Sequence, residues 1–276
     1  MQLGKMLRFR RIFPRRNSLI VAIDHGKYWG AIKGVERPVE LVKMIAESEA
    51  DGIMATPSII ELVGSSVGNL AVIARLDGGT TIFDDLTEDR MITTVEHAIS
   101  LGVDAGCVMC YIGCKRSPFL QQKVGLLAAK CANFGLPLIV EALPAKILQF
   151  HFIKDIKTSE KLEETREVLN PNDIMAVSRV ATELGADVVK THYVGTVEEY
   201  RKIVECTLVP ILVAGGPKTQ TDEEFLAIIK NAMDAGAKGI VMGRNVWQHK
   251  NPRGMIKALS KIVHDEKDVS EAMKFL

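Results

Sequence analysis

The fold is decided by the stretch Glu183-Leu184-Gly185-Ala186-Asp187-Val188-Val189-Lys190-Thr191-His192. A helical pattern ends at its glycine, and an apolar run that contains a lysine follows at once. The same joint recurs as Ser-Leu-Gly-Val-Asp at 100–104 and as Asp-Ala-Gly-Ala-Lys at 234–238. In each case the glycine stops a helix just before a strand. The repeat therefore indicates helices and strands that alternate along the chain.

Short apolar runs rich in Val and Ile predict eight strands. They are nearly continuously apolar, which is typical of parallel strands buried on both faces. The predicted strands are Leu19–Asp24, Gly52–Thr56, Ala71–Leu76, Ala105–Tyr111, Pro137–Ala142, Asp187–His192, Pro210–Ala214 and Gly239–Met242.

Helix signals lie between these runs. Pro38 suits a first helical turn, Asn170 is a good N-cap, and Thr221 with Glu224 predicts a capping box. Eight strand–helix repeats in about 250 residues predict a closed (β/α)₈ barrel, that is, a TIM barrel of the α/β class. The main alternative, an open doubly wound sheet, usually has a glycine-rich turn after its first strand, which this chain lacks.

We expect residues 1–276 to form a single barrel domain with a short N-terminal helix and a C-terminal helical tail. The charged insertion Pro144–Leu169 follows the fifth predicted strand, so a lid over the barrel mouth and a solvated excursion are both open interpretations.

The bulk composition narrows the function. The net charge is +1, with 47% hydrophobic and 25% charged residues, so no nucleic-acid surface is expected. The basic N-terminal run predicts a solvated amphipathic helix rather than a nucleic-acid contact. No apolar run has the ~20 residues of a membrane span, and the N-terminus has no signal-peptide pattern. Five cysteines, an odd number, favour the reducing cytoplasm over a disulfide scaffold.

The polar residues that end the apolar runs are the candidates for chemistry, because parallel barrels carry their active sites at the carboxyl ends of the strands. Lys190 lies inside the sixth predicted strand. Burial disfavours its charged form, and a neutral amine is the nucleophile that attacks a carbonyl to form an imine. An ion pair with a carboxylate of a neighbouring strand is the structural alternative.

Asp24 is the expected partner of Lys190, since the first strand also delivers a residue to the mouth. A carboxylate beside an imine can move protons during carbinolamine formation, dehydration and C–C cleavage. His25 follows directly, so on an ideal strand it faces the other way, and we weigh catalysis against packing for it.

Glycines after the seventh and eighth strands suit a phosphate. Gly215, Gly216 and Gly243 allow backbone N–H groups to approach a ligand closely, and Arg244 can add a bidentate contact. Barrels often bind phosphate with these two loops. The pair Cys107 and Cys110 lies three apart on one strand and so faces opposite sides, and we expect no metal site there.

Four motifs resemble the archaeal-type class I fructose-bisphosphate aldolases of the DeoC/LacD superfamily, a family that also includes aminodideoxyheptulosonate synthases and the thiolase that processes phosphorylated autoinducer-2. The motifs are Ile23-Asp24-His25-Gly26, Val189-Lys190-Thr191-His192-Tyr193, Val213-Ala214-Gly215-Gly216-Pro217-Lys218 and Gly243-Arg244-Asn245-Val246-Trp247-Gln248.

The resemblance implies a Schiff-base lysine at Lys190, an acid–base aspartate at Asp24, phosphate contacts at the glycines and Arg244, and ring-shaped homo-oligomers, often decamers. It implies no metal and no other cofactor. The aldolase and synthase branches carry a proton-donating tyrosine where this chain has Leu143, whereas the thiolase branch lacks it. Glu141 is a candidate substitute acid.

The predicted function is that of a metal-independent Schiff-base lyase or transferase acting on a phosphorylated ketose-like substrate. A thiolase-type acyltransferase is the second enzyme hypothesis. A non-catalytic phosphosugar-binding barrel is the hypothesis from another class.

Overall fold

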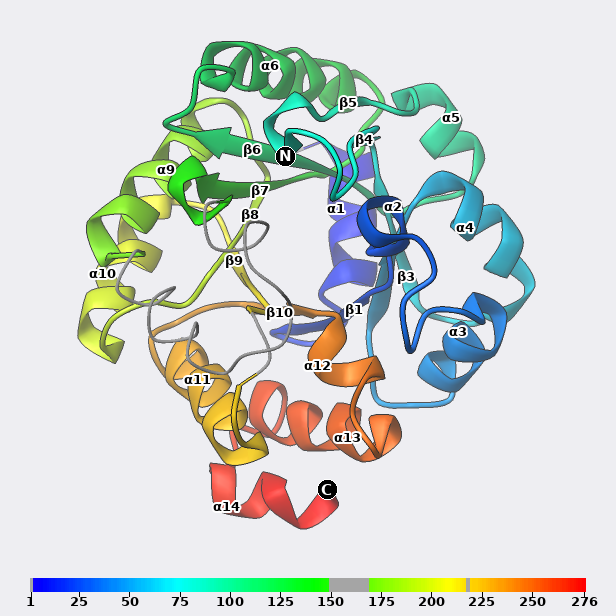
Figure 1. The fold of residues 1–276 in the computed structure, drawn as a ribbon, viewed down its shortest axis with the longest axis vertical. Coiled ribbons are helices and arrows are strands. Elements are labelled where there is room, and N and C mark those ends of the chain that lie inside the picture. The colour runs from blue at the N-terminus through cyan, green and yellow to red at the C-terminus, as the bar shows by residue number, and fades with distance from the viewer. Residues whose placement is uncertain (1, 149–168, 217–218) are drawn as a thin grey trace.

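A closed barrel of eight parallel strands forms the centre of the molecule (Figure 1). The computed structural model describes residues 2–148, 169–216 and 219–276. Neighbouring strands follow the order β1-β10-β9-β8-β7-β6-β3-β2, and β2 pairs with β1 to close the ring. The predicted fold class is confirmed. The barrel strands are β1 Ser18–Ala22, β2 Gly52–Ala55, β3 Ala71–Arg75, β6 Ala105–Ile112, β7 Leu138–Pro144, β8 Val188–Thr191, β9 Ile211–Ala214 and β10 Gly239–Met242.

Helices surround the barrel and alternate with its strands (Figure 1). Two of their starts carry predicted side-chain caps: the side chains of Asn170 and Thr221 accept hydrogen bonds from the backbone N–H groups of Asp173 and Glu224. The capping box predicted for Thr221 and Glu224 is only half formed, since the described contacts include no return bond from the Glu224 side chain. The described α-helices are α1 Leu3–Ile12, α2 Gly26–Trp29, α3 Pro38–Ala46, α4 Pro57–Val63, α5 Val95–Ser100, α6 Ser117–Asn133, α9 Pro171–Glu183, α10 Val197–Thr207, α11 Asp222–Asp234, α12 Arg244–Trp247, α13 Pro252–Val263 and α14 Val269–Ala272.

The structure adds one sheet that the sequence patterns did not predict. The two-residue strands β4 (Asp77–Gly78) and β5 (Arg90–Met91) pair antiparallel directly after β3. Segments this short show no periodicity, so a pattern of apolar residues cannot reveal them. They hold the loop between them against the barrel mouth, beside α2 (Figure 1).

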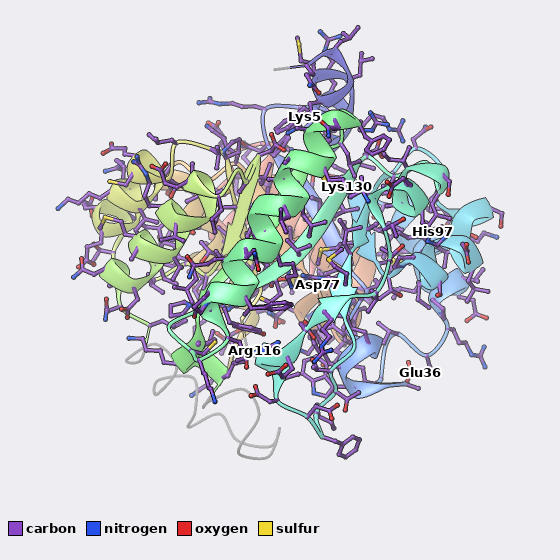
Figure 2. All side chains as sticks on the ribbon, turned by 90° about the horizontal axis from the view of Figure 1, so that it is seen from above. Lys5, Glu36, Asp77, His97, Arg116 and Lys130 are labelled. Carbon is purple, nitrogen blue, oxygen red and sulfur yellow. The ribbon has the colours of Figure 1, made fainter. Side chains whose placement is uncertain are left out.

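Helix α1 covers the end of the barrel where the strands begin. Ile12 is fully buried and packs with side chains of β1, β2 and β3, with Phe9 and Phe13 around it. Lys5 and Arg11 form ion pairs with Asp187 and Asp104, which lie just before two strands. In Figure 2 this end, marked by Lys5, lies opposite the end marked by Arg116.

The predicted N-terminal helix is therefore present, but describing it as solvated was only partly right, because one face is packed under the barrel. Among the described residues, none of the helices combines the length and apolar character that a membrane span requires. Most of the Pro144–Leu169 insertion lies outside the described residues, so the lid interpretation stays a prediction.

Candidate active site

A cavity of about 120 Å³, open at its mouth, lies at the carboxyl ends of the barrel strands. Every residue predicted for the site from the sequence lines it. Charged and polar side chains converge there from at least five strands or strand ends. They include Asp24, His25, Arg75, Glu141, Lys190 and Arg244.

Lys190 forms an ion pair with Glu141 inside this cavity. The two residues are directly opposite in the register of β7 and β8, and Nζ lies 2.7 Å from Oε1. Both side chains are at most 10% exposed. The partner of Lys190 is thus a carboxylate of the neighbouring strand, which was the structural alternative in the sequence analysis. An ion-paired lysine and a reactive lysine are compatible, because the pair keeps the amine at the cavity wall.

Arg75 links this pair to Asp24. Its Nη2 lies 2.5 Å from Oε2 of Glu141, and its Nε donates to Oδ2 of Asp24 at 2.8 Å. Asp24 and Lys190 form no ion pair with each other, because the guanidinium of Arg75 pairs with the aspartate instead. Two carboxylates and two cations alternate along this chain of contacts, so each buried charge has an opposite charge beside it.

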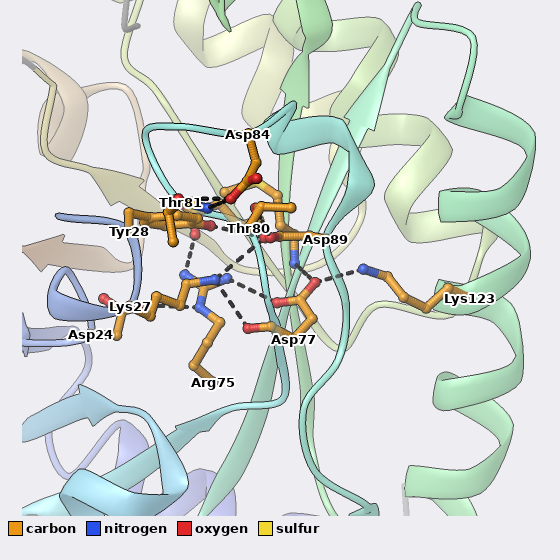
Figure 3. Close-up of polar contacts among 12 residues, drawn as sticks. Asp24, Lys27, Tyr28, Arg75, Asp77, Thr80, Thr81, Asp84, Asp89 and Lys123 are labelled. Atoms are coloured by element: carbon orange, nitrogen blue, oxygen red, sulfur yellow. Dashed lines mark hydrogen bonds and ion pairs between the residues drawn. The ribbon is translucent and has the colours of Figure 1, made fainter. Parts of the chain in front are cut away.

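A second group of buried charged side chains, around Asp77, holds Arg75 in place (Figure 3). Asp77 is fully buried and approaches Nη1 of Arg75 at 3.7 Å. Its other oxygen accepts from Nζ of Lys123 at 2.6 Å and from the backbone N–H of Met109 at 2.8 Å. The carboxylate is thereby tied to β6 and α6, which restricts the movement of the guanidinium.

The loop between β4 and β5 joins the same group through Asp89. The hydroxyl of Tyr28 donates to Asp89 at 3.0 Å, and Nζ of Lys27 lies 3.4 Å from the same oxygen (Figure 3). Lys27 also donates to the backbone oxygen of Asp77. These contacts hold α2, which begins two residues after Asp24, against the loop.

The ion pairs set the protonation of the carboxyl groups. Burial alone would raise the pKa of Glu141, but Lys190 and Arg75 outweigh burial and hold that pKa far below its usual range. The pKa of Asp24 is lowered in the same way, with Arg75 as the largest opposing charge. Both groups are therefore carboxylates at neutral pH. Glu141 is therefore charged at neutral pH, and the role of substitute acid considered for it above stays a prediction.

His25 lines the cavity, contrary to the expectation that it faces away. Strand β1 ends at Ala22, so the alternation of a strand no longer applies at position 25. Its ring stacks on Trp29 and meets Trp247 edge-on. Burial lowers the pKa of His25 to about 4 although Asp24 opposes this, so the imidazole is neutral at pH 7.

The predicted phosphate residues gather at one side of the cavity. Arg244 begins α12, and its guanidinium carbon lies 5.2 Å from the centre of the Trp29 ring. It forms no ion pair with any described carboxylate, and burial lowers its pKa. A β-carbon on Gly243 would overlap the ring of His25, and open space surrounds Gly216 where a side chain would be. Backbone without side chains and the guanidinium of Arg244 thus line the same cavity.

Sequence reasoning missed Arg75 and the charges behind it. A signal was present, since Arg75 is the last residue of β3 and ends an apolar run. The same test that selected Lys190 would have selected it. The residues Asp77, Lys123 and Asp89 carried no comparable signal, because they come from the two-residue strand β4, helix α6 and a loop, whose approach depends on the whole fold.

Comparison with known proteins agrees with this geometry. The barrel is that of a Schiff-base, aldolase-type lyase. The model of the DeoC/LacD family aldolases matches residues 18–249, and the chain belongs to this family.

Relatives and solved structures are similar over nearly the whole chain. An uncharacterised aldolase of Saccharolobus solfataricus is 35% identical over 99% of both chains. The 2-amino-3,7-dideoxy-D-threo-hept-6-ulosonate synthase of Halobacterium salinarum is 31% identical over 98% of this chain and 95% of its own. An archaeal fructose-1,6-bisphosphate aldolase, solved with its catalytic lysine covalently bound to the carbinolamine intermediate, has a TM-score of 0.78 at 28% identity, over 94% of this chain and 99% of that one.

Proposed function

We propose that the protein cleaves or forms a C–C bond of a phosphorylated ketose-like substrate through an imine on Lys190. The observation that carries this proposal is the position of Lys190: a buried lysine whose Nζ lies at the cavity wall, 2.7 Å from a carboxylate. Lys190 first gives up its proton to water, and the neutral amine attacks the substrate carbonyl. The carbinolamine then loses water, and the resulting iminium accepts the electrons of the broken C–C bond. This electron sink makes a metal unnecessary.

The carboxylates have separate roles in this proposal. Glu141 holds the amine in place and stabilises the positive iminium that replaces it. Asp24 transfers protons during carbinolamine formation and dehydration, since it lies on the other side of Arg75 in the same cavity. His25 is neutral at pH 7 and lies beside Asp24, with Nδ1 3.6 Å from Oδ1, so it is the second candidate for proton transfer.

The substrate phosphate binds at Arg244 with the backbone of Gly215, Gly216 and Gly243. Support comes from the position of Arg244 in the cavity, where no described carboxylate neutralises it. An anion would receive a charge-assisted contact there. The residues Pro217 and Lys218 of this motif lie outside the described residues.

Leu143 favours a second candidate function. Its apolar side chain lines the cavity two residues after Glu141 on β7, and it cannot exchange a proton with a hydroxyl group. Acyl transfer of the thiolase type needs no proton donor at that place.

We further propose that the protein works in the cytoplasm as a homo-oligomer, with a decameric ring as the expected form.

Borohydride trapping tests the proposed imine. The protein is incubated with dihydroxyacetone phosphate or with fructose 1,6-bisphosphate, reduced, digested and read by mass spectrometry. An adduct on the peptide that contains Lys190 is expected, together with its loss in Lys190→Met. Lys146→Met is the matched control, because Lys146 lies at the same end of the barrel but pairs with Asp173 outside the cavity. An adduct on Lys146 or Lys218 would contradict the assignment.

A further inference from the structure

The cavity holds a hydroxyl group that none of the roles above uses. Tyr111 lies on β6, is 5% exposed and lines the cavity together with Met109, two residues earlier on the same face of the strand. Among the described residues its hydroxyl has no hydrogen-bond partner. A buried hydroxyl normally finds one, so an unpartnered hydroxyl beside a cavity is available to a ligand.

The register of the sheet places Tyr111 next to the reacting centre. Tyr111 is directly opposite Leu143 in the pairing of β6 with β7, and Glu141, the partner of Lys190, is two residues before Leu143 on the same face. Glu141 is also the charged group with the largest influence on Tyr111. Tyr111 therefore lies on the strand next to that of Glu141, with β7 between it and Lys190, and lines the same cavity as both.

The other proton-carrying groups of the cavity are already engaged. Asp24 and Glu141 are held as carboxylates by Arg75, and the Tyr28 hydroxyl donates to Asp89 (Figure 3). Burial raises the pKa of Tyr111, so this phenol keeps its proton at neutral pH, whereas His25 and His192 carry no extra proton there. Tyr111 is thus a protonated hydroxyl group that can donate to an oxygen in the cavity without breaking a contact described here.

We propose that Tyr111 is the catalytic acid of C–C bond formation and, in reverse, the base of cleavage. This rests on the proposed function of Lys190. In the forming direction the enamine carbon on Lys190 attacks the carbonyl carbon of an aldehyde, and the C=N bond of the iminium re-forms. The aldehyde oxygen takes the electron pair of its C=O bond and the proton of Tyr111. The phenolate left behind faces the new iminium and Arg75, which stabilise it until solvent returns the proton.

Three partial reactions test this assignment in Tyr111→Phe. Borohydride trapping with dihydroxyacetone phosphate reports imine formation. Exchange of the hydrogen on the adjacent carbon in D₂O reports enamine formation. Condensation with glyceraldehyde 3-phosphate reports the step that needs the acid. We expect trapping and exchange to stay within about 3-fold of the wild type and condensation to fall by ~10²–10⁴, the usual contribution of a positioned acid.

The matched control is Tyr200→Phe. Tyr200 is also a buried tyrosine whose hydroxyl has no hydrogen bond among the described residues, but it lies on α10 away from the cavity. It should leave all three reactions unchanged. Condensation within about 3-fold of the wild type in Tyr111→Phe would overturn the role of Tyr111, and so would an equal loss of all three reactions, which would indicate a structural part. Absence of any adduct in the wild type would instead overturn the proposed function of Lys190, and the role of Tyr111 with it.

Discussion

Glu141 and Lys190 face each other across two neighbouring strands, with 2.7 Å between their charged atoms. Arg75 pairs with the other oxygen of the same carboxylate, so Glu141 forms ion pairs with two cations at once. This arrangement links stability and reactivity at one residue, because the carboxylate that holds the nucleophile also offsets two buried positive charges.

Replacing Glu141 by Gln should destabilise the protein by about 3 kcal/mol, because Lys190 and Arg75 lose the charge between them. Urea unfolding at pH 7 measures this. Glu183→Gln is the control, since Glu183 pairs with Arg179 on the exposed surface of α9 and an exposed pair contributes little. A loss below about 1 kcal/mol for Glu141→Gln would contradict the expected role of the pair.

The same variant should respond differently to acid. The pKa of Glu141 is lower in the folded protein than in the unfolded chain, so its stabilising contribution is present above the usual glutamate pKa of about 4.3 and is lost as pH falls below it. The difference in unfolding free energy between the wild type and Glu141→Gln should therefore shrink between pH 5 and pH 3. A difference that stays constant over this range would show that the charge is not its source.

The two cavity histidines should titrate unusually low. Burial lowers the pKa of His25 and of His192 to about 4. The unfolded chain takes up these protons near pH 6.5, so the folded state is destabilised as pH falls from about 6.5 to 4, by about 3 kcal/mol for each histidine. NMR titration of the imidazole signals measures the pKa values directly, and an ordinary value for both would refute the burial argument.

Arg244→Ala should weaken binding of a phosphorylated ligand by about 2 kcal/mol, as expected for a charged hydrogen bond. Calorimetry with dihydroxyacetone phosphate on the Lys190→Met background separates binding from imine formation. Arg253→Ala provides the comparison, because Arg253 is exposed and pairs with Glu47 outside the cavity. Equal affinities in the Arg244 variant and its parent would place the phosphate elsewhere.

Activity should survive removal of metal ions, because the iminium itself accepts the electrons of the broken bond. Turnover of fructose 1,6-bisphosphate or of the condensation substrates, measured before and after dialysis against EDTA, checks this. Loss of turnover that zinc restores would indicate a different mechanism.

The barrel was predictable because each apolar run and each glycine joint carries its signal locally. All eight predicted strands are present, with ends that differ by one or two residues, as at Asp24 and His192, which lie just beyond β1 and β8. Lys190, Asp24 and the strand-end glycines were predictable for the same reason: each directly follows or interrupts an apolar run.

The contacts between these residues were not predictable from local patterns. That Lys190 meets Glu141 depends on the register of β7 against β8, and that Asp24 meets Arg75 depends on the closure of the ring. His25 was placed on the wrong face because the end of β1 cannot be located to within one residue from composition alone. Arg75 could have been found, since it ends β3, but its third carboxylate partner, Asp77, could not.

The packing of α1 beneath the strands has a consequence for the order of events during turnover. Ile12 closes the end of the barrel where the strands begin, so reactants and products enter and leave the cavity described above at its mouth. The fragment bound to Lys190 sits at the wall and is tethered, whereas the second fragment is free once the C–C bond breaks. The free fragment must then depart first, and the tethered one only after hydrolysis of the imine. Because one fragment stays covalently attached while the other is free, the two products leave through the mouth in a fixed order. Product-inhibition patterns of the ordered type would show this order.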